Sequence, residues 1–322
     1  MDEFKIEKNI LEEYYNFQNI KKIIKHDGQN LNSKVFFFQN KKKNYVLKFV
    51  KDKNIRTKVE KRCQILITCK EEGLPVQEPI RNISNTFFTN NHYTVTKYYS
   101  GLHFDGSKKE LFSLSKNLAV LHKKLSNIKI DYNYNPNREL YKLLKNDEAV
   151  EIRDKIKEKK TKNVIDKLFL DNFILLQQSF SNVKMNLEYK KRQKQIIHFD
   201  LYPENVIFKN HQVYAILDFD TMRKGDVLDD ISFASFRFAL EKTSNNKEIK
   251  QKMKYFFDVY KRFNNKEISI NELPNGAMLQ ILKRISFIIK NYYLHSTPFW
   301  ESDLKKQLKL LKKIEQIKAI WN

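Results

Sequence analysis

Short apolar runs separated by polar turns fill much of the first hundred residues, a pattern that predicts strands. Two such runs are found at residues 34–39 and 45–50, and a third begins at residue 93 and runs into a loop that ends at Gly101. Helical spacing of apolar side chains occurs at residues 10–15. It occurs again after residue 55, where apolar positions recur every three or four residues until Gly73. The first part of the chain is therefore predicted to combine a sheet with two helices.

Helical spacing dominates the rest of the chain. The predicted helices span residues 114–125, 231–240, 249–263, 278–294 and 302–321. Between residues 127 and 192, lysine-rich sequence with three apolar clusters predicts a helical hairpin. Strands early in the chain and helices later predict an α+β fold, with a small β-rich lobe over residues 1–97 and a larger, mainly helical lobe over residues 98–322. A chain of 322 residues that is 41% apolar can bury a core in each lobe.

A strand pattern interrupts the helical part of the chain. Apolar strands are predicted at residues 196–197, 206–208 and 214–217. The polar turn 209–212 joins the last two. His198 and Asp200 follow the first strand, Asn205 directly precedes the second, and Asp218 directly follows the third. Since the outer ends of a hairpin meet, Asn205 and Asp218 are predicted to lie close together.

The resulting H-x-D-x-x-x-x-N loop, followed by a strand and an Asp, is typical of phosphoryl-transfer sites of the protein-kinase type. In such a site one carboxylate takes the proton of the acceptor hydroxyl. An amide oxygen and a second carboxylate hold Mg²⁺ against the nucleotide phosphates. We therefore predict Asp200 as the catalytic base, and Asn205 and Asp218 as metal ligands. Three fixed residues in eight also arise by chance, but the hairpin and the second Asp supply a context that a chance match lacks.

This segment resembles the aminoglycoside phosphotransferase and choline kinase superfamily of small-molecule kinases. The stretch 225–231 is similar to the G-D-P-x-x-D-L sequence of that family, with Val227 where proline is usual. The resemblance extends from about residue 28 to about residue 263 and implies a two-lobed, protein-kinase-like fold. It also implies that Asp230, together with His198, braces the catalytic loop.

Three further expectations follow from the same resemblance. Asp220 is either a ligand of a second metal ion or of the substrate, or a structural hydrogen-bonding residue. Residues 217–222 are most similar to the homoserine kinase type II and N-acetylhexosamine kinase branches. His122 lies in a helix similar to the L-A-x-L-H helix of the family, where it is expected to be a packed structural residue.

Lys48 stands inside the apolar strand 45–50, where an unpaired ammonium group would be costly to desolvate. The strand resembles the V-A-I-K strand of kinases, whose lysine reaches the α- and β-phosphates. Glu60, early in the next predicted helix, is the expected carboxylate partner of Lys48. The alternative is that Lys48 is one exposed lysine among many.

Nucleotide contacts are also expected at two loops. Gly28 lies in a polar loop before the first predicted strand, where kinases cover the phosphates, although this loop lacks the G-x-G-x-x-G sequence. The resemblance implies that the backbone of Lys97, Tyr98 and Tyr99 forms the hinge that binds the adenine.

The net charge of +23 raises the question of nucleic-acid binding. Only ten of the 61 basic residues are arginine, and the lysines are spread through predicted helices without a nucleic-acid motif. We therefore expect a solvated surface, or a surface that attracts nucleotide anions, and no nucleic-acid partner.

Neither a membrane nor an oxidising compartment is indicated. No segment approaches eighteen consecutive apolar residues, and the first residues lack the apolar core of a signal peptide, so we expect a cytoplasmic protein. Cys63 and Cys69, six positions apart in one predicted helix, are expected to be reduced packing residues.

These features predict an enzyme that transfers a phosphoryl group from ATP or GTP, with Mg²⁺, to an alcohol group of a small molecule. The expected acceptor is a sugar, an amino sugar or an amino alcohol such as homoserine, and the expected state is a monomer or a homodimer. An aminoglycoside antibiotic is an alternative acceptor. Residues 242–322 carry seventeen Lys and Arg but seven Asp and Glu, a balance that disfavours a polycation.

Two other classes of protein remain as alternatives. A catalytically silent relative would keep the fold as a binding or structural protein, but such relatives usually lose a metal ligand or the catalytic Asp. A protein kinase would need an A-P-E element and a longer activation segment after Asp218, and neither occurs before the helix predicted at residue 231.

Overall fold

The computed structural model describes residues 4–26, 33–51, 55–132, 142–186, 192–295 and 301–321. The chain divides into two compact units. Unit 1 comprises Met1–Tyr134 and Pro203–Met222, and unit 2 comprises Asn135–Tyr202 and Arg223–Asn322. The lobe boundary expected between residues 97 and 98 stays a prediction. Besides the sheet, unit 1 contains one helix and one hairpin that lie beyond residue 97 in the sequence.

The sheet of unit 1 contains β1 (Ile20–His26), β2 (Ser33–Asn40), β3 (Lys43–Val50), β4 (Pro79–Ile80) and β5 (Tyr93–Lys97). All neighbouring pairs are antiparallel, in the order β1-β2-β3-β5-β4. The three strands predicted from the sequence, β2, β3 and β5, are confirmed. Alternation explains β2, since Phe36 and Phe38 are buried while the residues between and beside them are less so.

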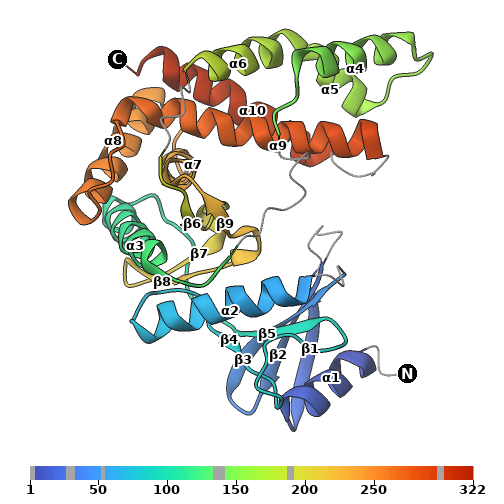
Figure 1. The fold of residues 1–322 in the computed structure, drawn as a ribbon, viewed down its shortest axis with the longest axis vertical. Helices are drawn as coiled ribbons and strands as arrows, with labels where there is room; N and C mark the ends of the chain where they lie inside the picture. The colour runs from blue at the N-terminus through green and yellow to red at the C-terminus, as the bar shows by residue number, and fades with distance from the viewer. Residues whose placement is uncertain are drawn as a thin grey trace. The chain divides into compact units, whose positions relative to one another are not determined.

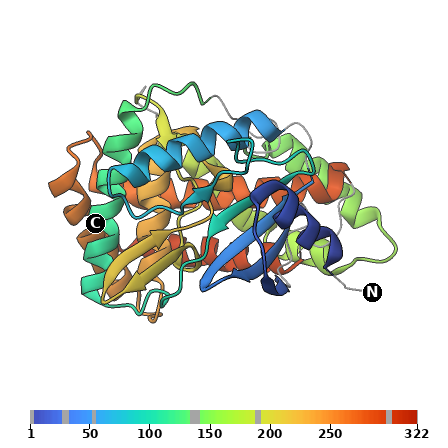
Figure 2. The same ribbon diagram turned by 90° about the horizontal axis from the view of Figure 1, so that it is seen from below.

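Two helices complete this part of unit 1, as predicted: α1 (Lys5–Tyr15) and α2 (Arg56–Glu71). Ile10 and Leu11 of α1 pack into a core with strands β2, β3 and β5. Figures 1 and 2 show α1 in dark blue beside the strands. Val59 and Cys63 of α2 form a second core with Val50. The chain leaves α2 through Gly73.

Unit 1 also contains α3 (Lys108–Asn127) and the predicted hairpin, formed by β7 (Val206–Lys209) and β8 (Gln212–Ile216). The turn is tighter than expected, because Lys209 and Gln212 already pair with each other. Asn210 and His211 make the turn with φ angles of 52° and 58°, as a two-residue hairpin loop requires. The hydroxyl of Ser113 on α3 accepts the Val213 N–H at 2.9 Å, which ties the helix to the hairpin.

Unit 2 contains two short antiparallel strands, β6 (Gln195–Ile197) and β9 (Arg223–Gly225), and four helices predicted from the sequence. These helices are α7 (Val227–Ala239), α8 (Asn246–Phe263), α9 (Leu273–His295) and α10 (Glu301–Ala319). Every residue of α7 is buried, so this helix is the centre of the unit. Figure 1 shows α9 and α10 side by side, in orange and red. A Cβ at Gly276 would collide with Ser232, so glycine allows α9 to approach α7.

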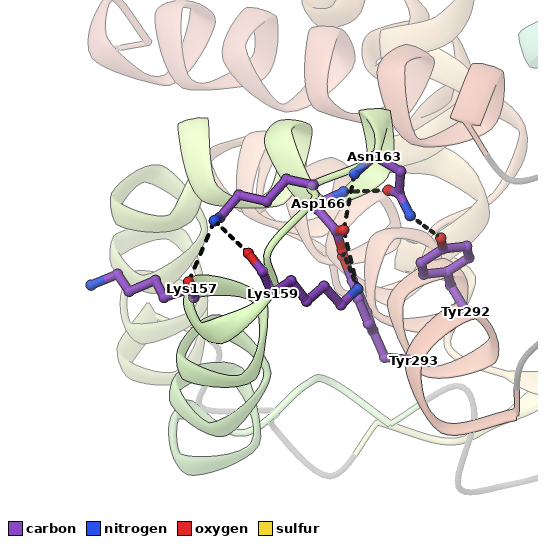
Figure 3. Close-up of polar contacts among 7 residues, drawn as sticks. Lys157, Lys159, Asn163, Asp166, Tyr292 and Tyr293 are labelled. Atoms are coloured by element: carbon purple, nitrogen blue, oxygen red, sulfur yellow. Dashed lines mark hydrogen bonds and ion pairs between the residues drawn. The ribbon is translucent and has the colours of Figure 1, made fainter.

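The prediction of a helical hairpin, with two helices, between residues 127 and 192 is wrong. The structure describes three helices there: α4 (Asn146–Glu158), α5 (Val164–Asp171) and α6 (Phe173–Asn186). The extra break has a local cause, because Asn163 and Asp166 exchange capping hydrogen bonds that start α5. Asp166 is fully buried. Its carboxylate accepts Lys159 Nζ at 2.8 Å and the Tyr293 hydroxyl at 2.9 Å, and Figure 3 shows these side chains converging on it. This buried carboxylate ties the α4–α5 connection to α9.

Two expectations about the surface and the cysteines can be compared with the structure. In the part of the chain that the structure describes, no helix is both long enough and apolar enough to cross a membrane. Cys63 and Cys69 are both buried and free on α2, as predicted. Burial raises the pKa of the Cys63 thiol to about 12, so this thiol stays neutral near pH 7.

Candidate active site

The predicted site residues are distributed over both units. Asp200 and its brace lie in unit 2, whereas Lys48, Asn205 and Asp218 lie in unit 1. In unit 2 the loop that carries Asp200 follows β6, which pairs with β9. A Cβ at Gly225 of β9 would lie 2.6 Å from Cδ1 of Ile197, so a larger residue there would require the end of this side chain to move.

Asp230 holds the start of this loop. Its carboxylate accepts the backbone N–H of His198 at 2.8 Å and that of Phe199 at 2.6 Å. Asp230 is buried on the first turn of α7, which Asp226 caps. These two bonds hold Phe199 at a φ of 73°, a left-handed conformation that is rare for a phenylalanine. The contact has the geometry that the sequence resemblance implied for a brace.

His198 supports the loop from within. It is fully buried, and its Nδ1 accepts the backbone N–H of Asp200 at 3.2 Å. The backbone of Asp200 is thereby fixed independently of its side chain. A loop fixed in this way defines the point from which the Asp200 side chain extends.

The carboxylate of Asp200 contacts a residue that the sequence did not indicate. Arg284 of α9 donates from Nη2 to Asp200 Oδ1, and the same nitrogen lies 3.5 Å from the carbonyl oxygen of Phe199. The guanidinium group lies over the ring of Phe233, 4.5 Å from its centroid. Asp200 therefore faces a guanidinium held in place by an aromatic ring.

In unit 1, Lys48 of β3 meets the segment that follows β8. Its ammonium group lies 3.5 Å from Asp218 Oδ1 and forms a closer ion pair with Asp220. Burial acts to lower the pKa of Lys48, but the carboxylates of Asp220 and Asp218 outweigh it and raise the pKa above its usual value. The side chain is therefore a charged donor within a strand, as predicted, and not an exposed lysine.

Asp218 has a constrained backbone. Its φ is 55°, in the left-handed region, and its N–H donates to Gln77 Oε1 at 2.7 Å. Its side chain remains 44% exposed, so its oxygens can reach a ligand. The N–H of Leu217, the preceding residue, donates to the carbonyl oxygen of Asn205 at 2.8 Å. The predicted proximity of Asn205 and Asp218 at the end of the hairpin is therefore confirmed for the backbone.

Asp220 is shared by two cations. Besides Lys48, it accepts Nη1 of Arg62 at 2.9 Å, and the Arg62 side chain is only 6% exposed. Burial acts to raise the pKa of the Asp220 carboxyl, but Arg62 and Lys48 outweigh it and hold the pKa below its usual range. Of the two roles left open for Asp220, these contacts favour the structural one.

The expected ion pair between Lys48 and Glu60 is wrong. The Glu60 carboxylate accepts the backbone N–H groups of Phe87 and Phe88, at 2.9 and 2.8 Å. It closes the loop that packs against α2 and leaves Lys48 to the aspartates. The physical reason is that two backbone N–H groups converge on the Glu60 carboxylate and supply its hydrogen bonds, so the carboxylate does not need Lys48 as a partner.

The expected nucleotide-binding residues are placed as follows. Gly28 lies outside the described residues. The N–H of Lys97 donates to the Glu78 carbonyl at 2.9 Å, and that of Tyr98 donates to the Asn44 carbonyl at 3.1 Å. Tyr99 is buried, with its hydroxyl 3.4 Å from the Val76 carbonyl. Two amides of the expected hinge are thus engaged with the sheet and its loops, and adenine binding by this segment stays a prediction.

Arg62 and Arg284 were not found by sequence reasoning. Arg62 left a usable signal, because it falls at helical spacing within the buried stripe that includes Val59, Cys63 and Leu66. An arginine on a buried stripe requires an anionic partner. Arg284 follows Lys283 within an apolar stretch of α9, but nothing local identifies Asp200 as its partner.

A second group of ligand-type side chains lies in unit 1. Asp105, Glu110 and His211 bring one possible metal-ligand atom each within 4.8 Å of one another. Glu110 accepts the Asp105 N–H at 2.9 Å, and Asp105 accepts the Ser107 N–H at 2.7 Å. These bonds form the turn that starts α3 and account for both acids.

The model of the phosphotransferase enzyme family, APH, matches residues 22–257. Among curated proteins, none matches the chain.

Solved structures match along nearly the whole chain. An amicoumacin kinase in complex with AMP-PNP, Ca²⁺ and Ami is 14% identical, with 98% of this chain and 94% of that chain covered and a TM-score of 0.68. An AMP-bound spectinomycin phosphotransferase is 14% identical, with 97% of this chain and 96% of that chain covered and a TM-score of 0.69. A choline kinase from Streptococcus pneumoniae is 16% identical, with 95% of this chain and 99% of that chain covered and a TM-score of 0.62. The predicted α+β, kinase-like fold is confirmed.

Proposed function

The chain belongs to the phosphotransferase enzyme family, APH, and from this premise we propose that it transfers the γ-phosphate of ATP or GTP to a hydroxyl group of a small molecule. One observation carries the proposal. Lys48 meets Asp218 at 3.5 Å although they are far apart in the sequence. A buried-strand lysine beside the carboxylate that follows a hairpin is what phosphate and metal binding in a kinase requires.

The residues proposed to bind the nucleotide are in unit 1. Lys48 would bind the phosphates, and the Gly28 loop and the backbone of residues 97–99 would bind the rest of the nucleotide. Relatives solved with AMP-PNP or AMP support a nucleotide ligand. The acids that already hold Lys48 would keep its ammonium group oriented until phosphates replace part of their charge.

The residues expected at the metal site fit Mg²⁺. Asn205 offers an amide oxygen and Asp218 a partly exposed carboxylate, both hard oxygen ligands joined through the Leu217–Asn205 backbone bond. Few protein ligands are the usual arrangement for this ion, which keeps waters and binds phosphate oxygens. When bound, Mg²⁺ would neutralise charge that develops on the phosphates.

Asp200 would act on the acceptor. Its carboxylate would accept a hydrogen bond from the acceptor hydroxyl and take its proton as the oxygen–phosphorus bond forms. The bond between the γ-phosphorus and the β,γ-bridging oxygen breaks, and the nucleoside diphosphate leaves with that electron pair. Asp230 and His198 would keep Asp200 in place through the backbone contacts described above.

For the acceptor we propose a sugar, an amino sugar or an amino alcohol such as homoserine. The similar structures include a spectinomycin phosphotransferase and a choline kinase. In this chain residues 242–322 carry seventeen basic and seven acidic residues, and Arg284 lies at Asp200. A polycation would approach against this charge.

The test is ADP release in a coupled assay with a panel of monosaccharides, amino sugars, homoserine, choline and kanamycin. We expect turnover with a neutral or zwitterionic member and little or none with kanamycin. Thermal stabilisation by AMP-PNP with Mg²⁺ is the companion measurement, because any ligand of the native state raises stability by mass action. A protein that shows neither turnover nor a nucleotide shift at millimolar ligand would be a silent relative instead.

A further inference from the structure

We infer that the acceptor carries a carboxylate group beside the hydroxyl that is phosphorylated, and that Arg284 binds this carboxylate. The inference rests on the proposed function, because it takes Asp200 to be the group that receives the acceptor's proton. It narrows the acceptor to hydroxy acids, including sugar acids and hydroxyl-bearing amino acids.

The first step is the position of Arg284. A catalytic carboxylate must face the acceptor hydroxyl, and Arg284 donates to one of its two oxygens, Asp200 Oδ1. The substituents next to that hydroxyl therefore lie within reach of the guanidinium group. Arg284 is held from behind by the Phe233 ring, at 4.5 Å, which limits its freedom to swing away.

The second step concerns the N–H donors of Arg284 that are not used by Asp200 or by the Phe199 carbonyl. Within the described ranges, both hydrogen bonds of Arg284 leave from Nη2, toward Asp200 and toward the Phe199 carbonyl. Its Nε is buried without a hydrogen-bond partner. Its side chain nevertheless keeps 24% of its surface exposed. Nη1 thus keeps its two N–H donors for a ligand, and a carboxylate oxygen is the acceptor that a guanidinium binds most strongly.

The third step is the surrounding charge. Further basic side chains lie over two aromatic rings of the loop that carries Asp200. Arg223 of β9 and Lys283 of α9 lie over the Phe199 ring. Arg237 of α7 and Lys306 of α10 lie over the Tyr202 ring. Lys283 is paired with Asp229 at 3.4 Å, so part of this charge is compensated. Asp230, which accepts the N–H groups of His198 and Phe199, adds a further carboxylate at the loop. Counted with Arg284, five basic side chains lie at the loop with the three acids Asp200, Asp229 and Asp230, a balance that suits an anion better than a quaternary ammonium or a polycation.

A carboxylate beside Asp200 would be repelled by the base unless a cation lay between them. Arg284 can supply that cation, with Nη2 on Asp200 and Nη1 on the ligand. Its role would then be recognition of the acceptor, which differs from merely orienting Asp200. The two roles separate in measurement. Loss of a purely orienting residue lowers kcat/KM by the same factor for all acceptors, whereas loss of a recognition residue adds a further decrease for acids alone.

The test uses the full chain and acceptor pairs that differ by one carboxylate: glycerate and glycerol, glucuronate and glucose, homoserine and 3-aminopropan-1-ol. We expect the best acceptor to be an acid, with kcat/KM at least about tenfold above that of its neutral or cationic partner, the ratio of one charge-assisted hydrogen bond. Arg284→Met should reduce this ratio to about threefold or less. Arg262→Met, which removes an exposed guanidinium from α8, should leave the ratio unchanged.

A binding measurement makes the outcome independent of turnover. With AMP-PNP and Mg²⁺ present, calorimetric titration of each pair should give tighter binding of the acid to wild type and to Arg262→Met, but not to Arg284→Met. The inference is overturned if the best acceptor or ligand is a neutral or cationic member. It is equally overturned if Arg284→Met lowers both members of a pair by the same factor. Failure of the kinase proposal has a different signature, loss of all turnover together with loss of nucleotide binding.

Discussion

Asp220 and Lys48 form an ion pair that joins the segment after β8 to the middle of β3. Arg62 of α2 binds the other oxygen of the same carboxylate. One acid therefore connects a strand, a helix and the chain next to Asp218. This arrangement replaces the lysine–glutamate pair expected from the sequence, and it makes the stability of unit 1 depend on the charge of Asp220.

Asp220→Asn should destabilise the protein by about 1–3 kcal/mol at pH 7, less than a fully buried pair because Asp220 is 34% exposed. The folded-state pKa of Asp220 is lowered, so its contribution is complete above the unfolded-state value of about 4 and is lost as the pH falls through the lower folded value. The raised pKa of Lys48 keeps its contribution intact until the pH rises above about 10. Urea unfolding of both proteins should give a constant difference from pH 5 to pH 8 that narrows below about pH 4. A difference independent of pH down to pH 2.5 would contradict this account.

Much of the fold could be predicted because its signals are local. The β7–β8 hairpin, β2, β3 and the long helices follow from apolar periodicity and turn residues. β1 was missed because lysines at positions 21, 22 and 25 interrupt its apolar residues. Such a sequence is tolerated at the edge of a sheet, where β1 lies, since fewer of its side chains need burial.

The residues of the candidate site likewise include some that the local sequence indicates and some that it does not. Asp200, Asn205 and Asp218 could be proposed as site residues from the sequence because their spacing lies within one short stretch. Arg284 could not, because nothing in its own segment points to Asp200. The buried stripe of α2 indicates that Arg62 needs an anionic partner, but nothing in that segment identifies Asp220 as the partner. Glu60 was assigned the wrong partner for a related reason. Its true partners are backbone amides, and the sequence does not mark which amides are unsatisfied.

Glu60→Gln tests the corrected assignment. The variant keeps one oxygen for the Phe87 and Phe88 amides, so we expect a loss of about 0.5–1.5 kcal/mol in the free energy of unfolding. The Kd of AMP-PNP should stay within about twofold of wild type, because Lys48 has other partners. Glu71→Gln, an exposed change on the same helix, is the matched control. A large loss of nucleotide affinity in Glu60→Gln alone would restore the original pairing.

Asp230→Asn should weaken the brace of the loop that carries Asp200. An amide side chain can accept only one of the two N–H groups of His198 and Phe199, so one buried donor loses its partner at a cost of about 1–3 kcal/mol. We expect kcat to fall at least tenfold while the Kd of AMP-PNP changes little. Asp258→Asn, exposed on α8, controls for the loss of one charge. Normal kcat in a less stable Asp230→Asn protein would limit the role of Asp230 to folding.

Asp218→Ala should separate metal binding from nucleotide binding. Thermal stabilisation by AMP-PNP is measured with Mg²⁺ and with EDTA. In wild type we expect the shift to be larger with Mg²⁺, since the ion links the phosphates to the protein. In the variant the two shifts should coincide. A metal-dependent increase that survives in Asp218→Ala would show that other residues bind the ion.

Asp200→Asn should abolish turnover with every acceptor. The change is nearly isosteric and removes the only carboxylate proposed to take the acceptor's proton. The asparagine oxygen can still accept from Arg284, and the His198 contact uses the backbone, so the melting temperature should stay within a few degrees. Nucleotide-dependent stabilisation should also persist, because Lys48 and Asp218 lie in the other unit. Retention of most of the activity by a folded, nucleotide-binding Asp200→Asn protein would exclude Asp200 as the base, whereas loss of nucleotide binding would point to a wider structural role.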